Sequence, residues 1–255
     1  MQSSEFSFNG IHSYDMGFMN IRMGSSLANR ELVGERKINI SNYGSKSDYF
    51  VQSIDKDPIE FKLLISPIDD RKWTPELYRK LVSWLVLDEY KECYSGDDPY
   101  KIYYAICSDY VTWEGVNDYG AIPFSFVTNA NHAWTIKKRY SFDIDTEKEI
   151  SIDNLSVFKE TRYYPKMVIK KKNSNGDIVI ENKSNAGYKF ELKNISPSET
   201  IVVDNDYRLI YSQDSPRNIY GESFNKKWLY FVDGINKIKV IGDCEIIMDC
   251  QYPTA

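Results

Sequence analysis

Short runs of alternating apolar and polar residues, separated by turn residues about every 8–12 positions, recur along most of this 255-residue chain. Alternation with a period of two predicts half-buried strands, because successive side chains of a strand point to opposite faces. Twenty Tyr and twelve Phe raise the aromatic share to 15% and favour strands over helices. Many short strands at this spacing are typical of a sandwich or a barrel. The sequence therefore predicts a mainly β fold.

Two Asn-Gly pairs predict turns between strands. Asn9 and Gly10 follow the aromatic run of Phe6 and Phe8, and a second pair lies in the loop 173–177. Asn-Gly favours tight turns, because both residues accept a positive φ angle. The second loop separates the apolar runs 167–169 and 178–180. We expect these two runs to pair with each other as a β-hairpin.

One segment is typical of a helix, over about 75–92. Thr74 can cap the helix, and Pro75 fits its first position, where the missing N–H costs nothing. One helical stripe of apolar residues can then bury against a sheet. The stripe comprises Leu77, Leu81, Trp84 and Leu85.

Composition divides the chain near residues 128–132, which are small and polar. We expect one domain over 1–133, with the helix and mixed β structure, and a second over 134–255 that is β only. Residues 1–133 hold 13 Lys and Arg against 19 Asp and Glu, a balance of -6, whereas 134–255 hold 19 against 18. Neither half is strongly basic, which argues against a nucleic-acid-binding domain.

No pattern of catalytic or metal-binding residues is recognisable. Neither of the two histidines, His12 and His132, lies in a sequence pattern of metal ligands. No nucleotide-binding or nucleophile motif occurs. Asp143 and Asp145 resemble the opening of a calcium loop but lack its Gly and its final Glu. The same pair leaves open a glycoside hydrolase, as the weakest reading. We expect no catalytic residue, no cofactor and no metal.

The first five residues lack the basic flank and apolar stretch of a signal peptide, and no apolar run approaches the roughly 18 residues of a membrane span. We therefore expect assembly in a cytoplasm, with no membrane partner and the four cysteines as free thiols.

The ordered motifs resemble those of siphophage distal tail proteins, which form the baseplate hub. The resemblance at the N-terminus rests on an aromatic strand, an Asn-Gly turn and a Ser-x-Asp-x-Gly-like segment, supplied by Phe6, Phe8, Asn9, Gly10, Asp15 and Gly17. Further on, the segments 177–182, 187–190, 199–204 and 234–238 follow the order of the family's galectin-like C-terminal domain.

This resemblance implies an N-terminal split-barrel-like β domain with one α-helix and a C-terminal galectin-like β-sandwich. It implies a non-enzymatic virion protein that forms a homohexameric ring at the tail tip. The implied partners are the tail tube protein, a tail-associated hub or lysin protein, and receptor-binding or fibre proteins. DNA would pass the lumen without specific binding, which suits the acidic first half. The six motif residues would support the ring domain or simply begin its own core sheet.

A monomeric carbohydrate-binding module for cell-wall glycans is the alternative. Trp113, Trp134 and Trp228 would then have to form an exposed platform for sugar rings. The cluster of His, Arg, Asn and Trp that sugar-binding galectins use is not recognisable, so the resemblance does not imply sugar binding.

Overall fold

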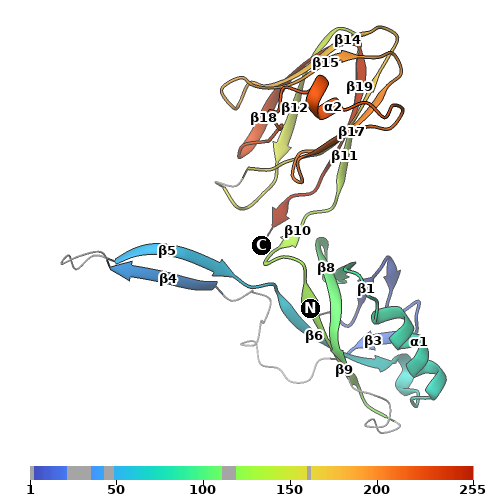
Figure 1. Cartoon of the computed structure of the whole chain (residues 1–255). Coiled ribbons are helices and arrows are strands. Elements are labelled where there is room, and N and C mark those ends of the chain that lie inside the picture. The colour runs from blue at the N-terminus through green and yellow to red at the C-terminus, as the bar shows by residue number, and fades with distance from the viewer. Residues whose placement is uncertain (1–2, 22–35, 43–48, 111–118, 160–161, 255) are drawn as a thin grey trace. The chain divides into compact units, whose positions relative to one another are not determined.

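The chain folds into two units in a computed structural model that describes residues 3–21, 36–42, 49–110, 119–159 and 162–254. Unit 1 comprises Met1–Trp134 and unit 2 comprises Thr135–Thr254 (Figure 1). Strands dominate both units, so the mainly β prediction is confirmed. No helix among the described residues is long and apolar enough to span a membrane.

Unit 1 is built on one antiparallel sheet with the strand order β2-β1-β7-β8-β9-β6-β3, and β10 pairs with β8. Its strands are β1 (Phe6–Phe8), β2 (Ile11–His12), β3 (Phe18–Asn20), β6 (Glu60–Pro67), β7 (Lys91–Ser95), β8 (Asp98–Tyr110), β9 (Ile122–Thr128) and β10 (Ala133–Trp134). The alternation that predicted strands is present in β9, where every second residue is buried. That face packs into the core of unit 1.

The helix α1 (Pro75–Leu85) covers this core. The hydroxyl of Thr74 accepts a hydrogen bond from the amide of Leu77 (3.2 Å), as the capping prediction requires. The buried residues of α1 are Leu81, Trp84 and Leu85. The helix ends at Leu85 rather than at 92, because Lys91 already begins β7 and the chain must turn back to pair with β1. A short 3-10 helix, η1 (Ile68–Asp70), precedes α1.

A separate two-stranded antiparallel sheet consists of β4 (Arg36–Asn42) and β5 (Tyr49–Lys56), which Figure 1 shows as a hairpin. Ile38 lies opposite Ile54 and Ile40 lies opposite Val51. All eight residues of β5 are exposed, and the described side chains of this hairpin are absent from the core of unit 1.

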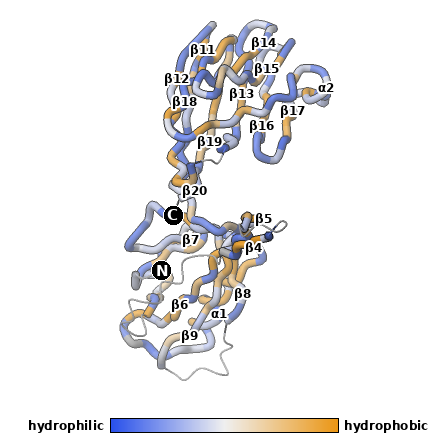
Figure 2. The backbone as a smooth tube through the Cα atoms, turned by 90° about the vertical axis from the view of Figure 1, so that its left-hand side faces the viewer, coloured by the Kyte–Doolittle hydropathy of each residue, from blue (hydrophilic) through white to orange (hydrophobic). Residues whose placement is uncertain are grey.

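Unit 2 contains two antiparallel sheets, with the strand orders β11-β19-β13-β16-β17 and β12-β18-β14-β15. The strands of the first sheet are β11 (Lys138–Ile144), β13 (Lys166–Lys171), β16 (Thr200–Asp204), β17 (Leu209–Ser212) and β19 (Cys244–Cys250). Those of the second are β12 (Glu147–Asn154), β14 (Gly176–Asn182), β15 (Tyr188–Ile195) and β18 (Gly234–Ile241). The last strand of the chain is β20 (Pro253–Thr254). Hydrophobic positions recur along these strands (Figure 2) and supply one core.

The predicted hairpin around residues 173–177 is wrong. The two apolar runs lie in β13 and β14, but β13 pairs with β16 and β19 while β14 pairs with β15 and β18. The loop therefore crosses from one sheet to the other. Ile169 and Ile180 belong to the same core from opposite sheets. Burial of both runs against each other across the core outweighs the local preference for a tight turn.

Unit 2 also contains a short helix that the sequence did not predict, α2 (Ile219–Glu222). Asn218 caps it, since its side-chain oxygen accepts a hydrogen bond from the amide of Gly221 (3.1 Å). At four residues, α2 is too short for an apolar periodicity to indicate it.

Candidate assembly and attachment surfaces

The motif residues Phe6 and Phe8 lie inside unit 1. Both are fully buried, and both contact Trp84 of α1, with ring centroids 5.4 Å apart for Phe6 and 6.4 Å apart for Phe8. The indole nitrogen of Trp84 also donates a hydrogen bond to the carbonyl of Phe8 (3.1 Å). These two phenylalanines join the first strand to the helix, so they stabilise unit 1 from within and leave no ring face for a partner.

Asn9 and Gly10 form the turn that their types predict. Their φ angles are 53° and 75°, and the turn places Phe8 opposite Ile11 in the β1–β2 hairpin. The amide of Asn9 donates a hydrogen bond to the carbonyl of Glu92 (2.8 Å). This turn therefore also holds the start of the chain against the segment that leads through β7.

Asp15 and Gly17 lie in the next turn. Gly17 has a φ angle of 83°, its amide donates to Tyr14 (2.9 Å), and its carbonyl accepts from Ile68 (3.0 Å). The Asp15 side chain is exposed. Apart from this exposed carboxylate, the residues that carry the resemblance shape one corner of unit 1, and their role in a ring stays a prediction.

Among the described residues of unit 1, the β4–β5 hairpin carries the largest group of exposed apolar side chains. The exposed fractions are 58% for Ile40, 67% for Tyr49, 56% for Phe50 and 60% for Val51, and Ile38 and Ile54 are exposed as well. An isolated two-stranded sheet in water is at best marginally stable, and a contiguous apolar surface usually marks an interaction site. This hairpin is the strongest candidate for an assembly surface.

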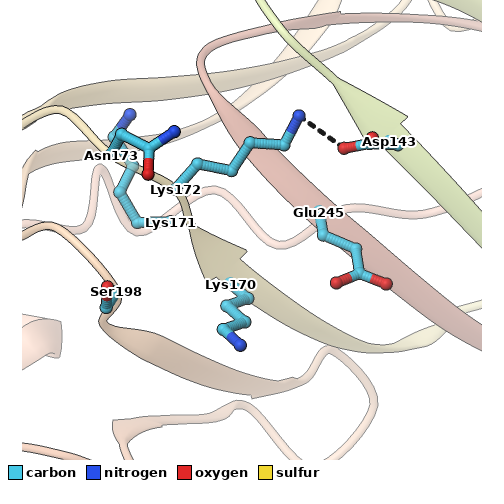
Figure 3. Close-up of a pocket in the computed structure, with 7 residues that line it drawn as sticks. All are labelled: Asp143, Lys170, Lys171, Lys172, Asn173, Ser198 and Glu245. Atoms are coloured by element: carbon cyan, nitrogen blue, oxygen red, sulfur yellow. Dashed lines mark ion pairs between the residues drawn. The ribbon is translucent and has the colours of Figure 1, made fainter.

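Unit 2 contains a polar cavity of about 470 Å³ at the end of β13 (Figure 3). Its lining residues are Asp143, Lys170, Lys171, Lys172, Asn173, Ser198 and Glu245. The amine of Lys172 pairs with Asp143 (2.5 Å) and Asp145 (2.8 Å), and the hydrogen bonds that it donates to these two carboxylates raise the pKa of Lys172. The amine of buried Lys171 donates to the carbonyl of Asp243 (2.9 Å). Two of the three lysines that line this cavity are thus held by neighbouring groups.

Asp143 and Asp145 lie open to solvent and share one lysine. Both side chains are largely exposed, at 75% and 93%, and both are held by Lys172. Paired carboxylates at an open surface lack the burial that raises the pKa of a general acid. Within the described residues, no group of three or more His, Cys, Asp or Glu side chains is placed to hold a metal ion.

Two family models match the chain. One, described as a phage tail protein N-terminal domain, matches residues 1–130, and the other, described as a phage tail C-terminal domain, matches residues 132–250. The chain belongs to this family of phage tail proteins. Among curated proteins, the tail protein is 25% identical over 263 residues to the SPbeta prophage-derived protein YomH of Bacillus subtilis (strain 168), with 98% of each chain covered.

Solved structures show the same fold over nearly the whole tail protein. The SPP1 Dit (gp 19.1) protein, described as a paradigm of the hub adsorption apparatus of phages that infect Gram-positive bacteria, matches with a TM-score of 0.68 at 10% identity and covers 97% of this chain and 98% of its own. A chain of the phage P2 baseplate in its activated conformation matches with a TM-score of 0.56 at 8% identity, covering 96% and 97%. The predicted resemblance to siphophage distal tail proteins is confirmed.

The tryptophan platform of the alternative reading does not form among the described residues. Trp113 lies outside them, Trp134 belongs to unit 1, and Trp228 is buried in unit 2 against Phe224, with ring centroids 4.7 Å apart. The sequence reasoning also missed the β4–β5 hairpin of this tail protein. The signal in the sequence was the run of three consecutive apolar residues Tyr49, Phe50 and Val51. Such a run places apolar side chains on both faces of a strand, which suits a strand that a partner covers.

Proposed function

We propose that this phage tail protein is a structural, non-enzymatic distal tail protein that closes into a homohexameric ring at the tail tip. Unit 1 forms the ring and meets the tail tube protein on one side and a tail-associated hub or lysin protein on the other. Unit 2 carries or contacts receptor-binding or fibre proteins. The ring assembles in the cytoplasm of the host bacterium, and DNA passes its lumen without specific binding.

The observation that carries this proposal is the exposed β4–β5 hairpin. Its apolar side chains lie on a sheet of only two strands, so a neighbouring subunit that covers them removes a large apolar area from water. A closed ring repeats this contact once per subunit and leaves no hairpin uncovered. The fold shared with the SPP1 hub protein supports the same arrangement.

The charge of the chain supports passage of DNA without binding. Residues 1–133, which make up the proposed ring domain, carry a balance of -6. Negative charge repels phosphate, and an interface for nucleic acid would instead need clustered Lys and Arg.

The absolute mass of the purified full chain, measured by light scattering coupled to size exclusion, tests the ring. Six copies of the 29.8 kDa chain weigh about 179 kDa, and we expect this species. The double variant Ile40→Ser, Phe50→Ser removes two exposed apolar side chains of the hairpin and should elute as a monomer of 29.8 kDa.

A matched control is Ile235→Ser, which removes an equally exposed apolar side chain (62%) from unit 2 and should leave the hexamer intact. A wild-type chain that stays monomeric at every concentration would contradict a self-assembling ring. A hexamer that persists in the hairpin variant would show instead that other surfaces of unit 1 form the ring.

A further inference from the structure

Three loop segments of unit 2 place positive charge together. Residues 162–166, 207–208 and 225–230 contain five Lys and Arg and no Asp or Glu. The cations are Arg162, Lys166, Arg208, Lys226 and Lys227. Although these segments are far apart in the sequence, ring contacts join them: the Tyr164 and Tyr230 centroids lie 5.7 Å apart. These segments therefore bring several cations together on a unit whose total charge is close to neutral.

Two arginines of this surface lie on aromatic rings. The guanidinium carbon of Arg162 is 4.7 Å from the centroid of Tyr230, and that of Arg208 is 4.4 Å from the centroid of Tyr164. Tyr188 completes the group, with its ring 5.1 Å from that of Tyr230. We call these five residues the arginine–tyrosine cluster. Stacking on a ring holds a guanidinium in one plane and leaves its N–H groups free to donate.

The two arginines of the cluster differ from the other described arginines of unit 2. Arg139 pairs with Asp249 (2.7 Å), and Arg217 pairs with Glu199 (3.0 Å). Among the described residues, no carboxylate lies within ion-pair distance of Arg162 or Arg208. Among the residues that the structure describes, a carboxylate pairs with only one cation of this surface, Lys166, which lies 2.8 Å from Asp204. The cluster thus presents two exposed guanidinium groups without an internal counter-ion.

Buried amides fix the loops that carry the cluster. Asn205 is fully buried; its amide donates to the carbonyl of Pro165 (2.6 Å) and its oxygen accepts from the amide of Leu229 (2.8 Å). The side chain of Asn182 donates to the carbonyl of Tyr230 (3.0 Å). These contacts hold the arginine-bearing loop 162–166 against the loop 225–230 before any ligand is bound, which lowers the entropic cost of binding.

We propose that the arginine–tyrosine cluster binds an acidic segment of another tail protein through that segment's carboxylates. Planar guanidinium groups bind carboxylates through paired N–H donors. The exposed side chains of Tyr207 (78%) and Leu209 (52%) lie beside Arg208 in the sequence and offer apolar contacts to the same segment. This site specifies how unit 2 would act as an attachment point, and the inference rests on that proposed role.

A protein segment fits this surface better than a glycan. Sugar rings stack on free aromatic faces, but guanidinium groups already cover one face of Tyr164 and one of Tyr230. The combination of Tyr, Trp and Arg with exposed apolar neighbours is that of protein–protein hot spots. Trp228 contributes as well, since the Arg208 guanidinium carbon lies 5.7 Å from its ring centroid.

Binding of a labelled probe to the full chain tests the site by fluorescence anisotropy. The probe is a synthetic peptide of alternating glutamate and leucine, and its control carries glutamine in place of glutamate. We expect the acidic peptide alone to bind, with affinity that falls as ionic strength rises from about 0.05 to about 0.3 M. The double variant Arg162→Gln, Arg208→Gln should weaken binding about tenfold or more.

Two further variants separate charge from geometry. Arg139→Gln makes the same change at an exposed arginine outside the cluster, and should weaken binding less than about twofold. The double variant Arg162→Lys, Arg208→Lys keeps the charge but loses the planar fork, and should bind with intermediate affinity. Thermal unfolding of each variant verifies that it is folded.

Three results would overturn the proposal: no binding of the acidic peptide, equal binding by the Arg162→Gln, Arg208→Gln variant, or preferential binding of polygalacturonate, which would assign the cluster to an anionic glycan. The peptide assay measures binding to unit 2 whether the chain is a monomer or a hexamer. Failure of the ring and failure of this site are therefore distinguishable, because mass measures the first and anisotropy the second.

Discussion

A buried asparagine of unit 2 allows one prediction of stability to be worked out in detail. Asn236 is fully buried in β18, and its side chain makes four hydrogen bonds. Its oxygen accepts from the amide of Val232 (2.9 Å) and from the side chain of Asn182 (2.9 Å). Its nitrogen donates to the carbonyls of Val232 (2.9 Å) and Gly234 (2.9 Å). Asn236 thus satisfies the backbone of the loop 230–234.

Asn236→Ala removes all four bonds at once. A typical intramolecular hydrogen bond contributes about 1 kcal/mol to stability, and a buried group left without a partner costs more. The carbonyl of Val232 keeps one partner, because the side chain of Asn154 also donates to it (3.1 Å). We therefore expect a loss of about 3–4 kcal/mol in the free energy of unfolding of unit 2, a large fraction of a domain's usual stability of about 5–15 kcal/mol.

Urea unfolding of the full chain, followed by circular dichroism, measures this loss, and hydrogen exchange of the segment 225–240 locates it. Asn225→Ala is the matched control: its side chain makes two exposed hydrogen bonds, to Lys189 (3.0 Å) and from Lys227 (3.1 Å). Its loss should be about 1 kcal/mol. A difference between the two variants below about 1 kcal/mol would refute the reasoning, since it would mean that water replaces the lost bonds of Asn236.

Further substitutions test local features of both units. Thr74→Ala should cost unit 1 about 1 kcal/mol, measured by urea unfolding, because the amide of Leu77 loses its cap. Gly10→Ala should lower the free energy of unfolding by about 1–2 kcal/mol because of its φ of 75° alone, since no atom lies near an added Cβ. Gly242→Ala should lower it more, because the added Cβ would lie 2.9 Å from the carbonyl oxygen of Asp177. A hydrogen bond from Arg139 lowers the pKa of Asp249. The pair therefore stabilises unit 2 fully at pH values above the pKa of Asp in the unfolded chain. This stabilisation disappears as the pH falls through the lower pKa of the folded state. Arg139→Gln should accordingly lower the stability measured by urea unfolding at pH 7 and lower it progressively less below about pH 4, and equal losses at both pH values would contradict this assignment.

Local signals were sufficient to predict several elements of the fold. The cap at Thr74, the turn at Asn9 and Gly10, and the alternation in β9 each depend on residues that are neighbours in the sequence. In each segment, packing into the core requires the same backbone conformation that the local sequence prefers. When local preference and core packing agree in this way, an element can be predicted from the sequence alone.

Non-local pairing could not be predicted in the same way. Asn175 and Gly176 carry a hairpin signal, but β13 and β14 enter different sheets, because each run buries its apolar face against the opposite sheet. The arginine–tyrosine cluster was missed for a related reason: Arg162, Arg208 and Tyr230 are at least 22 positions apart in the sequence. In the visible charge run 170–172, Lys172 instead pairs with Asp143 and Lys171 donates to the carbonyl of Asp243.

The buried asparagines of unit 2 give the cluster a physical basis. Burying an amide costs free energy unless every polar group is paired, so an apolar residue is the cheaper way to fill a core. Yet Asn154, Asn182 and Asn236 all bond to the backbone of the loop 230–234, and Asn205 joins two further loops. These loops also place the ring of Tyr230 against the guanidinium of Arg162. Such amides are explained if the loops must hold one shape, as a preorganised binding surface requires.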